Sequence, residues 1–99
     1  MYVLLWRYRV LRGKEAEFER HYAPEGTWAR FFSAGQGYLG TELLGDGRHE
    51  YVTIDRWESE LDYLRFRAAN QAEYVSIDER CARLTEREEA LGAFTRHPA

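Results

Sequence analysis

The chain has 99 residues, of which 44% are hydrophobic and 31% are charged, and its formal net charge is −3. A chain of this length forms one domain with a single core, and the absence of a basic stripe argues against nucleic-acid binding. A single cysteine permits no intrachain disulfide and is typical of a reducing compartment. No apolar stretch is long enough to span a membrane, and no signal peptide is evident. We therefore expect a cytoplasmic protein that binds neither nucleic acid nor membranes.

Residues 2–11, YVLLWRYRVL, predict the first strand. The even positions are apolar or aromatic throughout, whereas the odd positions are apolar at the ends and carry Arg7 and Arg9 in the middle. Successive side chains of a strand point to opposite faces, and a strand that is apolar on both faces is covered on both. We assign Trp6 and Tyr8, on even positions, to a subunit interface.

Two helical pieces and a hairpin come next in the chain. Helix formers predict a first helix at 14–22, and the aromatic residues at 28, 31 and 32 predict a second piece that ends by Gly35. Two short strands, at 38–44 and 50–57, flank the turn signal Gly-Asp-Gly at 45–47 and predict a hairpin.

A long helical region and a final strand complete the chain. Ser59 and Asp62 have the spacing of a capping box and predict a helix start, and the same signature at 76–79 predicts a bend or restart there. Apolar residues recur in two helical stripes. One stripe is Leu61, Leu64, Ala68 and Val75, and the other is Phe66, Asn70, Ile77, Cys81 and Leu84. The last strand is predicted at 88–95.

The element order β-α-β-β-α-β is the split βαβ pattern of ferredoxin-like domains. It predicts an α+β fold with a four-stranded antiparallel sheet, formed by a single domain at 1–96 with a tail at 97–99. Both helical regions then lie on one face of the sheet, and the other face requires a cover because the first strand is apolar on both sides. We predict a homodimer in which two sheets pack face to face and bury on the order of 1,500 Å².

The string GQGYLG at 35–40 has the G-x-G-x-x-G spacing of dinucleotide-binding loops. In such a loop the glycines follow a strand and open a helix, whereas here they follow a predicted helix and open a strand. We interpret Gly35 as a helix stop, Gly37 as a turn and Gly40 as a position of close approach within the strand.

The chain from about Leu5 to Phe94 resembles the antibiotic biosynthesis monooxygenases. The resemblance rests on GKEAEFERHY, GTWARFF, GYLGTELL and YVTIDRWES, and on the spacing from Trp57 through Tyr63 to Phe66. It implies a dimeric α+β barrel with a pocket between the sheet and the helices of each subunit. Some members oxidise aromatic polyketides with O₂ and use neither metal nor flavin, others bind and degrade haem, and related barrels include isomerases and proteins without known catalysis.

The haem-degrading members carry an Asn, a Trp and an iron-ligating His where this chain has Arg7, Phe66 and Ser76. All three positions depart from that pattern, and the histidines of this chain lie on the first helix, the hairpin and the tail. Without an axial imidazole, haem degradation of this type is not expected. The resemblance then favours the members that work without a cofactor.

Oxidation of a phenol without a cofactor requires a base that removes a proton, donors that hold the resulting anion, and a dry site that O₂ reaches. Arg7 lies mid-strand, so it either stabilises such an anion or forms a salt bridge, for which Asp55 is the expected partner. Asp55 is either a general base, if burial raises its pKa, or the partner of an arginine. His21 is another candidate base, or a packed side chain beside Phe18.

Five aromatic side chains are candidates for the wall of a substrate pocket. They are Trp28, Trp57, Tyr63, Phe66 and Tyr74. Each also has a structural interpretation, which is core packing for most of them and a half-exposed helix position for Tyr74. Cys81 lies in an apolar stripe without a neighbouring His, so we expect an inert core thiol. No spacing of His, Cys or carboxylate residues suggests a metal site.

These residues support two main functions. The first is a cofactor-independent monooxygenase that oxidises a polyphenol-like or polyketide-like aromatic small molecule with O₂. The second is a non-catalytic dimer of the same fold that holds a small ligand or acts as an accessory protein. A non-oxidative barrel enzyme, such as an isomerase or cyclase, is a third alternative. No catalytic triad or metal motif decides among them, because one fold hosts all three.

Overall fold

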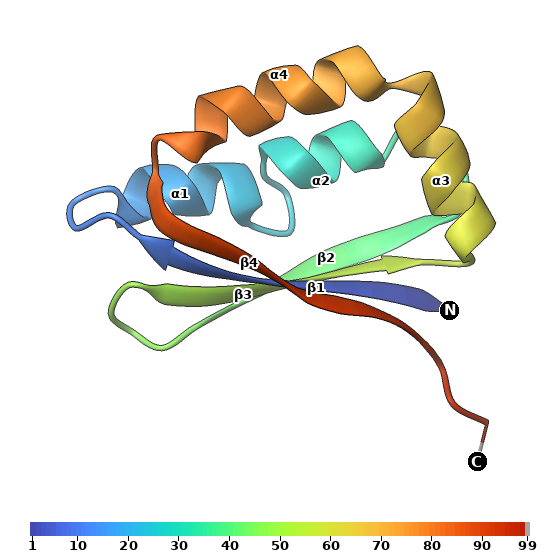
Figure 1. The fold of residues 1–99 in the computed structure, drawn as a ribbon, viewed down its shortest axis with the longest axis horizontal. Helices are drawn as coiled ribbons and strands as arrows, with labels where there is room; N and C mark the ends of the chain where they lie inside the picture. Colours follow the sequence, from blue (N-terminus) through green and yellow to red (C-terminus); the bar gives the residue numbers. More distant parts are fainter. Residues whose placement is uncertain (99) are drawn as a thin grey trace.

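The computed structural model describes residues 1–98 and contains a four-stranded sheet with helices on one side. The strands are β1 (Tyr2–Val10), β2 (Tyr38–Gly45), β3 (Glu50–Trp57) and β4 (Thr85–Thr95), in the order β2-β3-β1-β4, with every neighbouring pair antiparallel. The helices are α1 (Glu15–Tyr22), α2 (Thr27–Phe32), α3 (Glu60–Ala69) and α4 (Gln71–Ala82), and all lie on one face of the sheet (Figure 1). The predicted ferredoxin-like α+β fold is confirmed, with β1 in the middle of the sheet.

The core lies between the helices and the sheet face that they cover. Val10 of β1 is 1% exposed, and Phe18 of α1 and Trp57 of β3 are fully buried. Aromatic rings contact one another across this layer. Tyr8 and Tyr22 have ring centroids 4.9 Å apart, and Phe18 stacks on Tyr22 at 4.1 Å. Tilted and offset contacts of this kind add to the stabilisation from buried apolar area.

Trp6 and Tyr8 belong to this helix-covered face, so their assignment to a subunit interface is wrong. Hydrophobicity alone did not distinguish the two faces of β1, because both are apolar at their ends. The helices cover the even-numbered face, and Arg7 and Arg9 are exposed on the other side. These two arginines are the signal that could have decided the question, because a charge is costly to bury beneath a layer of helices.

The long helical region divides at Asn70, and the predicted restart at Ser76 is wrong. Asn70 has φ −129° and ψ 28°, and its side-chain amide donates to the Phe66 carbonyl at 2.9 Å. An Asn side chain that bonds the backbone in this way competes with helical hydrogen bonds, and here it ends α3. The predicted cap at Ser59 is confirmed, because Ser59 Oγ accepts a hydrogen bond from Asp62 N–H at 3.1 Å.

Only one of the two apolar stripes in this region belongs to the core. In the stripe of Phe66, Ile77, Cys81 and Leu84, each side chain is 6% exposed or less. In the other stripe Leu61, Leu64 and Val75 are 41% to 54% exposed. The burial predicted for Cys81 is confirmed, and it raises the pKa of the thiol, which disfavours the reactive thiolate. None of the helices in the described part of the chain is long and apolar enough to cross a membrane.

Strand β4 begins at Thr85, earlier than the predicted position 88. Its first residues are polar and pair with Arg9 and Val10 of β1, so this part of the strand carries no apolar signal in the sequence. The strand ends at Thr95, and residues 96–98 have no regular secondary structure. The last residue of the predicted tail, at position 99, lies outside the described residues.

The glycines of GQGYLG shape the connection between α2 and β2. A Cβ on Gly35 would lie 2.6 Å from Phe66 Cδ1 and 3.0 Å from Trp57 Cη2, so the close approach expected at Gly40 is found at Gly35 instead. Gly40 has φ +131° at a register shift between β2 and β3, and Gly37 has φ +90° in the turn. A bulge and a turn with positive φ both favour glycine. The motif opens a strand and is not a dinucleotide-binding loop.

Gly35→Ala is expected to destabilise the fold by about 1–3 kcal/mol, because the added methyl group overpacks the rings of Phe66 and Trp57. Urea denaturation followed by tryptophan fluorescence measures the change. Gly13→Ala is a suitable comparison, because a Cβ there meets nothing within 4 Å and only the φ of +88° opposes it. A denaturation midpoint for Gly35→Ala equal to that of the wild type would contradict the assigned close packing.

Candidate functional site

A cavity opens between the helix-covered face of the sheet and helices α1, α2 and α4. All four strands contribute to its wall. The wall residues are Trp6, Tyr8, Tyr22, Trp28, Phe32, Thr41, Thr53, Asp55, Tyr74, Asp78 and Glu88. The cavity volume is about 40 Å³, and the space between the wall atoms is about 420 Å³ when the open mouth is included. The closed part is large enough for water but too small for a flat aromatic ligand, which requires the side chains at the mouth to move apart.

Asp55 is a carboxyl in the cavity wall that is largely withdrawn from water. It lies opposite Thr41 in the β2–β3 register, and Thr41 Oγ1 donates a hydrogen bond to Asp55 Oδ1 at 2.6 Å. The Tyr38 hydroxyl lies 2.5 Å from Thr41 Oγ1 and extends this chain of hydrogen bonds. Burial raises the pKa of Asp55 to about 6, although the Thr41 hydrogen bond acts in the opposite direction. A carboxyl that titrates near neutrality beside a cavity is suited to exchange protons with a bound molecule.

Thr41→Val is expected to raise the pKa of Asp55 further, because it removes the hydrogen bond that stabilises the carboxylate. An NMR titration of the carboxyl carbons measures this pKa without any substrate. Thr85→Val on β4 is the control, because Thr85 does not line the cavity and its removal should leave the titration of Asp55 unchanged. An unchanged Asp55 pKa in Thr41→Val would show that this hydrogen bond does not form in solution.

Two buried polar side chains of the wall lack a hydrogen-bond partner within residues 1–98. Trp28 is 8% exposed with an unpartnered Nε1, and Thr53 is 3% exposed with an unpartnered Oγ1. Trp28 Nε1 lies near the Tyr22 hydroxyl, and Thr53 Oγ1 lies near the Tyr8 hydroxyl, but neither pair has the geometry of a hydrogen bond. An unsatisfied buried polar group costs roughly 1–3 kcal/mol. Water or a polar ligand in the cavity would satisfy both groups.

The charged side chains that line the cavity are all carboxyls. Asp55 lies on β3, and Asp78 of α4 and Glu88 of β4 are exposed. No Lys, Arg or His of the described chain lines this space. No group of three His, Cys, Asp or Glu side chains within residues 1–98 could hold a metal ion. The cavity therefore combines aromatic walls with negative charge.

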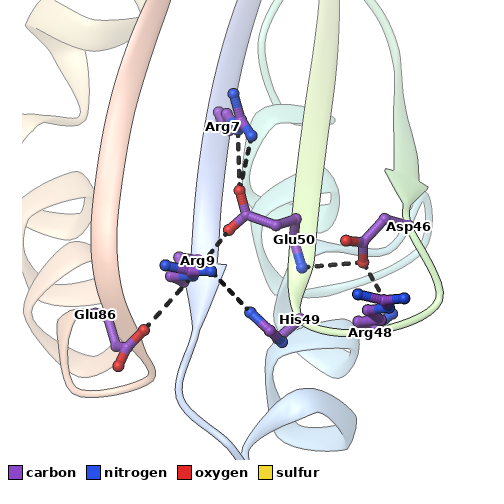
Figure 2. A network of polar contacts seen from close by, with 7 residues as sticks. All are labelled: Arg7, Arg9, Asp46, Arg48, His49, Glu50 and Glu86. Atoms are coloured by element: carbon purple, nitrogen blue, oxygen red, sulfur yellow. Dashed lines mark hydrogen bonds and ion pairs between the residues drawn. The ribbon is translucent and has the colours of Figure 1, made fainter.

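Arg7 lies on the opposite face of the sheet, and its predicted salt bridge to Asp55 is wrong. Asp55 is opposite Leu4 in the β1–β3 register, and strand alternation places residues 4 and 7 on different faces. Arg7 instead donates to Glu50, with Nη2 2.9 Å and Nε 3.1 Å from Oε1 (Figure 2). Arg9 lies beside the same carboxylate, with Nε 3.4 Å from Glu50 Oε2. Arg7 thus takes part in an ion-pair network outside the cavity.

His21 also lies outside the cavity wall. Its Nδ1 is 2.8 Å from Thr27 Oγ1, and this hydrogen bond links α1 to the first residue of α2. Burial lowers the pKa of His21, so its ring is neutral at pH 7. These contacts favour the structural interpretation of His21 as a packed side chain.

Of the five predicted pocket residues, Trp28 and Tyr74 line the cavity. The others, Trp57, Tyr63 and Phe66, form an aromatic cluster beside it. In that cluster the Trp57 ring is 5.6 Å from Tyr63 and 5.5 Å from Phe66, measured between centroids. Their packing matches the alternative interpretation of these three as core residues. The structure thus brings Asp55, Trp28 and Tyr74 together and leaves the remaining candidates outside.

The sequence and the fold of this chain are similar to those of known proteins. The sequence profile of the antibiotic biosynthesis monooxygenases matches residues 1–74. The chain belongs to this family. SnoaB, a cofactor-independent oxygenase from Streptomyces nogalater, is 27% identical to it with a TM-score of 0.79, over 99% of this chain and 94% of SnoaB.

Two more distant structures share the fold of this family member. A Deinococcus radiodurans protein, described as a candidate antibiotic biosynthesis monooxygenase, has a TM-score of 0.78 at 11% identity, over 100% of this chain and 95% of that one. A NIPSNAP family protein from Agrobacterium tumefaciens has a TM-score of 0.64 at 18% identity, over 98% of this chain and 94% of that one. No curated protein matches the sequence. These likenesses below 25% identity concern the fold alone.

Most wall residues of this family member were not predicted, because they are far apart in the chain. The wall residues without a sequence prediction for the site are Trp6, Tyr8, Tyr22, Phe32, Thr41, Thr53, Asp78 and Glu88. One signal was present. Thr53 and Asp55 are two residues apart on a predicted strand, so they share a face with each other. Two polar side chains on a strand face that otherwise carries Tyr51 and Trp57 indicate a polar site or a cavity.

Proposed function

We propose that this family member is a cofactor-independent monooxygenase that oxidises an aromatic small molecule of the phenol or anthrone type with O₂. The observation that carries the proposal is Asp55, a partly buried carboxyl with a raised pKa in the wall of an aromatic cavity. The similarity to SnoaB, at 27% identity over nearly the whole chain, supports the same class of chemistry.

Asp55 is the proposed general base. Burial raises the pKa of Asp55 from 3.8 to about 6, which reduces the difference between this pKa and that of a phenol, near 10. The remaining difference of roughly four pKa units corresponds to about 5–6 kcal/mol, a cost that an enzymatic barrier accommodates. The carboxylate form predominates at pH 7, so the base is in its active state.

Neutral donors are proposed to hold the substrate anion. Proton transfer to Asp55 moves one negative charge from the carboxylate to the substrate and leaves the net charge of the cavity unchanged. The unpartnered Trp28 Nε1–H and Thr53 hydroxyl are free to donate to a substrate oxygen. Burial raises the pKa values of Tyr8 and Tyr22, so both phenols stay protonated and are further donors. Donors that are already oriented stabilise a developing oxyanion without reorganisation.

The oxidation itself needs no external reductant. For an anthrone, the ring CH₂ loses two hydrogens, one atom of O₂ becomes the new carbonyl oxygen, and the other leaves as water. The substrate supplies all four electrons, and the products are a quinone and one molecule of water. Aromatic walls keep bulk water away from the anion, which favours its reaction with O₂.

We also propose that the functional unit is a homodimer. The sheet face opposite the helices carries apolar side chains from all four strands. These are Val3, Leu5, Leu44, Val52, Ile54, Leu91 and Phe94. Leu44, Leu91 and Phe94 are 43% to 54% exposed in the single chain. Small soluble domains rarely leave several large apolar side chains of one face in water, and a second copy packed face to face would cover them.

The direct test is oxygen uptake by the purified, EDTA-treated protein with a panel of anthrones and naphthols. The expected result is consumption of one O₂ per quinone formed, with one labelled atom in the product when ¹⁸O₂ is used, and no conversion without oxygen. Ligand binding without oxygen uptake across the panel would instead support the alternative, a non-catalytic ligand-binding dimer. The NIPSNAP-like fold is compatible with both functions, so this measurement is what separates them.

A further inference from the structure

We propose that Asp78 and Glu88 form a charge filter at the mouth of the cavity, which admits uncharged or amine-bearing aromatic ligands and rejects aromatic carboxylates. This inference rests on the proposed role of the cavity as the ligand site and adds the substrate class that it accepts. It concerns the charge of the ligand, which neither the family profile nor the similarity to SnoaB specifies.

The two carboxyls are exposed and line the cavity from different elements. Asp78 lies on α4 one turn after Tyr74, and Glu88 lies on β4 opposite Tyr8 of β1. Partial burial of the carboxyl against the cavity wall, followed by the negative charge of Asp78, raises the pKa of Glu88, which indicates that the two acids interact. Within residues 1–98 neither carboxyl takes part in a salt bridge. Their charge is therefore not neutralised by a neighbouring side chain.

The cavity behind these two carboxyls has neutral hydrogen-bond donors but, within residues 1–98, no cationic side chain that would bind an anion. Asp55 adds a third carboxyl to the wall, and no cationic side chain of the described chain lines it. Arg67 packs against the wall residue Tyr74, with Cζ 3.5 Å from the ring centroid, but it does not line the space itself. A carboxylate entering the mouth meets the like charges of Asp78 and Glu88, and at low ionic strength this repulsion is only weakly screened.

The buried wall also indicates that the site is built for a polar but uncharged group. Trp28 Nε1 and Thr53 Oγ1 are both more than nine-tenths buried, unpartnered, and part of the cavity wall. A hydroxyl or carbonyl on the ligand would satisfy them. Unpartnered neutral donors inside the cavity favour an uncharged polar group there, and the unpaired carboxylates at the mouth favour an amine over a carboxylate.

Three ligands with the same ring system test this inference: 1-naphthalenemethanol, 1-naphthylmethylamine and 1-naphthoate. Isothermal titration calorimetry at pH 7.5 and low ionic strength is expected to give the tightest binding for the amine and the weakest for the carboxylate. The two should differ by about tenfold or more, which corresponds to 1.4 kcal/mol. The difference should narrow at about 0.5 M salt, because salt screens the exposed mouth.

The double variant Asp78→Asn/Glu88→Gln separates the effect of the two mouth carboxylates on binding from the effect of Asp55. This variant should bind the amine more weakly and the carboxylate more tightly than the wild type does. Its affinity for the alcohol should stay within about twofold of the wild-type value, because only the charge at the mouth changes. Glu73→Gln/Glu79→Gln is the matched control, because it removes two exposed carboxyls from the same helix without touching the cavity. The charge filter would be contradicted if the wild type bound the carboxylate and the alcohol equally, or if the mouth variant changed the affinity for all three ligands equally. Neither result would contradict the proposed function. Absence of binding by all three would overturn the charge filter as well, whereas oxygen uptake with an anthrone would leave the proposed function standing.

Discussion

Asp55→Asn is expected to lower the rate of oxygen uptake by about 10²–10⁴-fold, the usual contribution of a positioned general base. The amide has nearly the shape of the carboxyl and still accepts the Thr41 hydrogen bond, so the cavity is preserved while the proton acceptor is lost. The wild-type rate should rise with pH through about 6, where Asp55 ionises, and the residual rate of the variant should lack this step. Steady-state oxygen uptake from acid to neutral pH measures both effects.

The stability of the same variant provides an independent check on the pKa. Folding raises the pKa of Asp55 from 3.8 to about 6, so the protonated carboxyl favours the folded state. This contribution is fully present below pH 3.8 and is lost as the pH rises through about 6. Thermal unfolding should therefore show that the stability of the wild type relative to Asp55→Asn falls over this interval. At pH 7 the variant should be at least as stable as the wild type.

A control and a contrary outcome complete this experiment. Glu79→Gln removes an exposed carboxyl from α4, outside the cavity wall, and should leave both the rate and its pH dependence unchanged. If Asp55→Asn is folded and retains the full rate, Asp55 is not the base, and the proposed mechanism fails even if the protein is an oxygenase.

The double variant Leu44→Glu/Leu91→Glu is expected to raise the dimer dissociation constant by about 10³-fold or more, because burial of a charge costs several kcal/mol per ion. Both leucines border one groove on the sheet face away from the helices, together with Val52 and Arg7. They are 46% and 43% exposed in the single chain, so the fold of the protomer tolerates the change. Analytical ultracentrifugation across micromolar concentrations measures the dissociation constant.

The matched control for the dimer interface lies on the other layer of the molecule. Leu61→Glu/Leu64→Glu introduces the same two charges at leucines that are 54% and 50% exposed on α3. This variant should remain dimeric, because the proposed interface is the open face of the sheet. Dissociation caused by the α3 substitutions but not by those on the sheet would place the interface on the helices instead. A wild-type protein that is monomeric at micromolar concentration would contradict the proposed dimer.

Local sequence patterns determined the elements of this protein and their order. The alternation in 2–11, the turn signal at 45–47 and the cap at Ser59 each act over a few residues, and each appears in the structure where it was predicted. The order of these elements in turn predicted the antiparallel ferredoxin-like sheet with β1 in the centre. Such signals are reliable because they depend on backbone geometry and on neighbours that are close in the chain.

The tertiary structure decided which of these residues meet. The two faces of β1 are both apolar at their ends, and the packing of the helices decided that Trp6 and Tyr8 line the cavity while Arg7 lies outside it. Asp55 acquires its raised pKa from burial and its hydrogen bond from Thr41, fourteen positions away. Burial, pairing and charge at a site depend on groups that are distant in sequence, and a local pattern carries no information about them. The sequence therefore predicted the fold and named Asp55 as a candidate base, and the packing of the chain decided that Asp55 lies in the cavity wall.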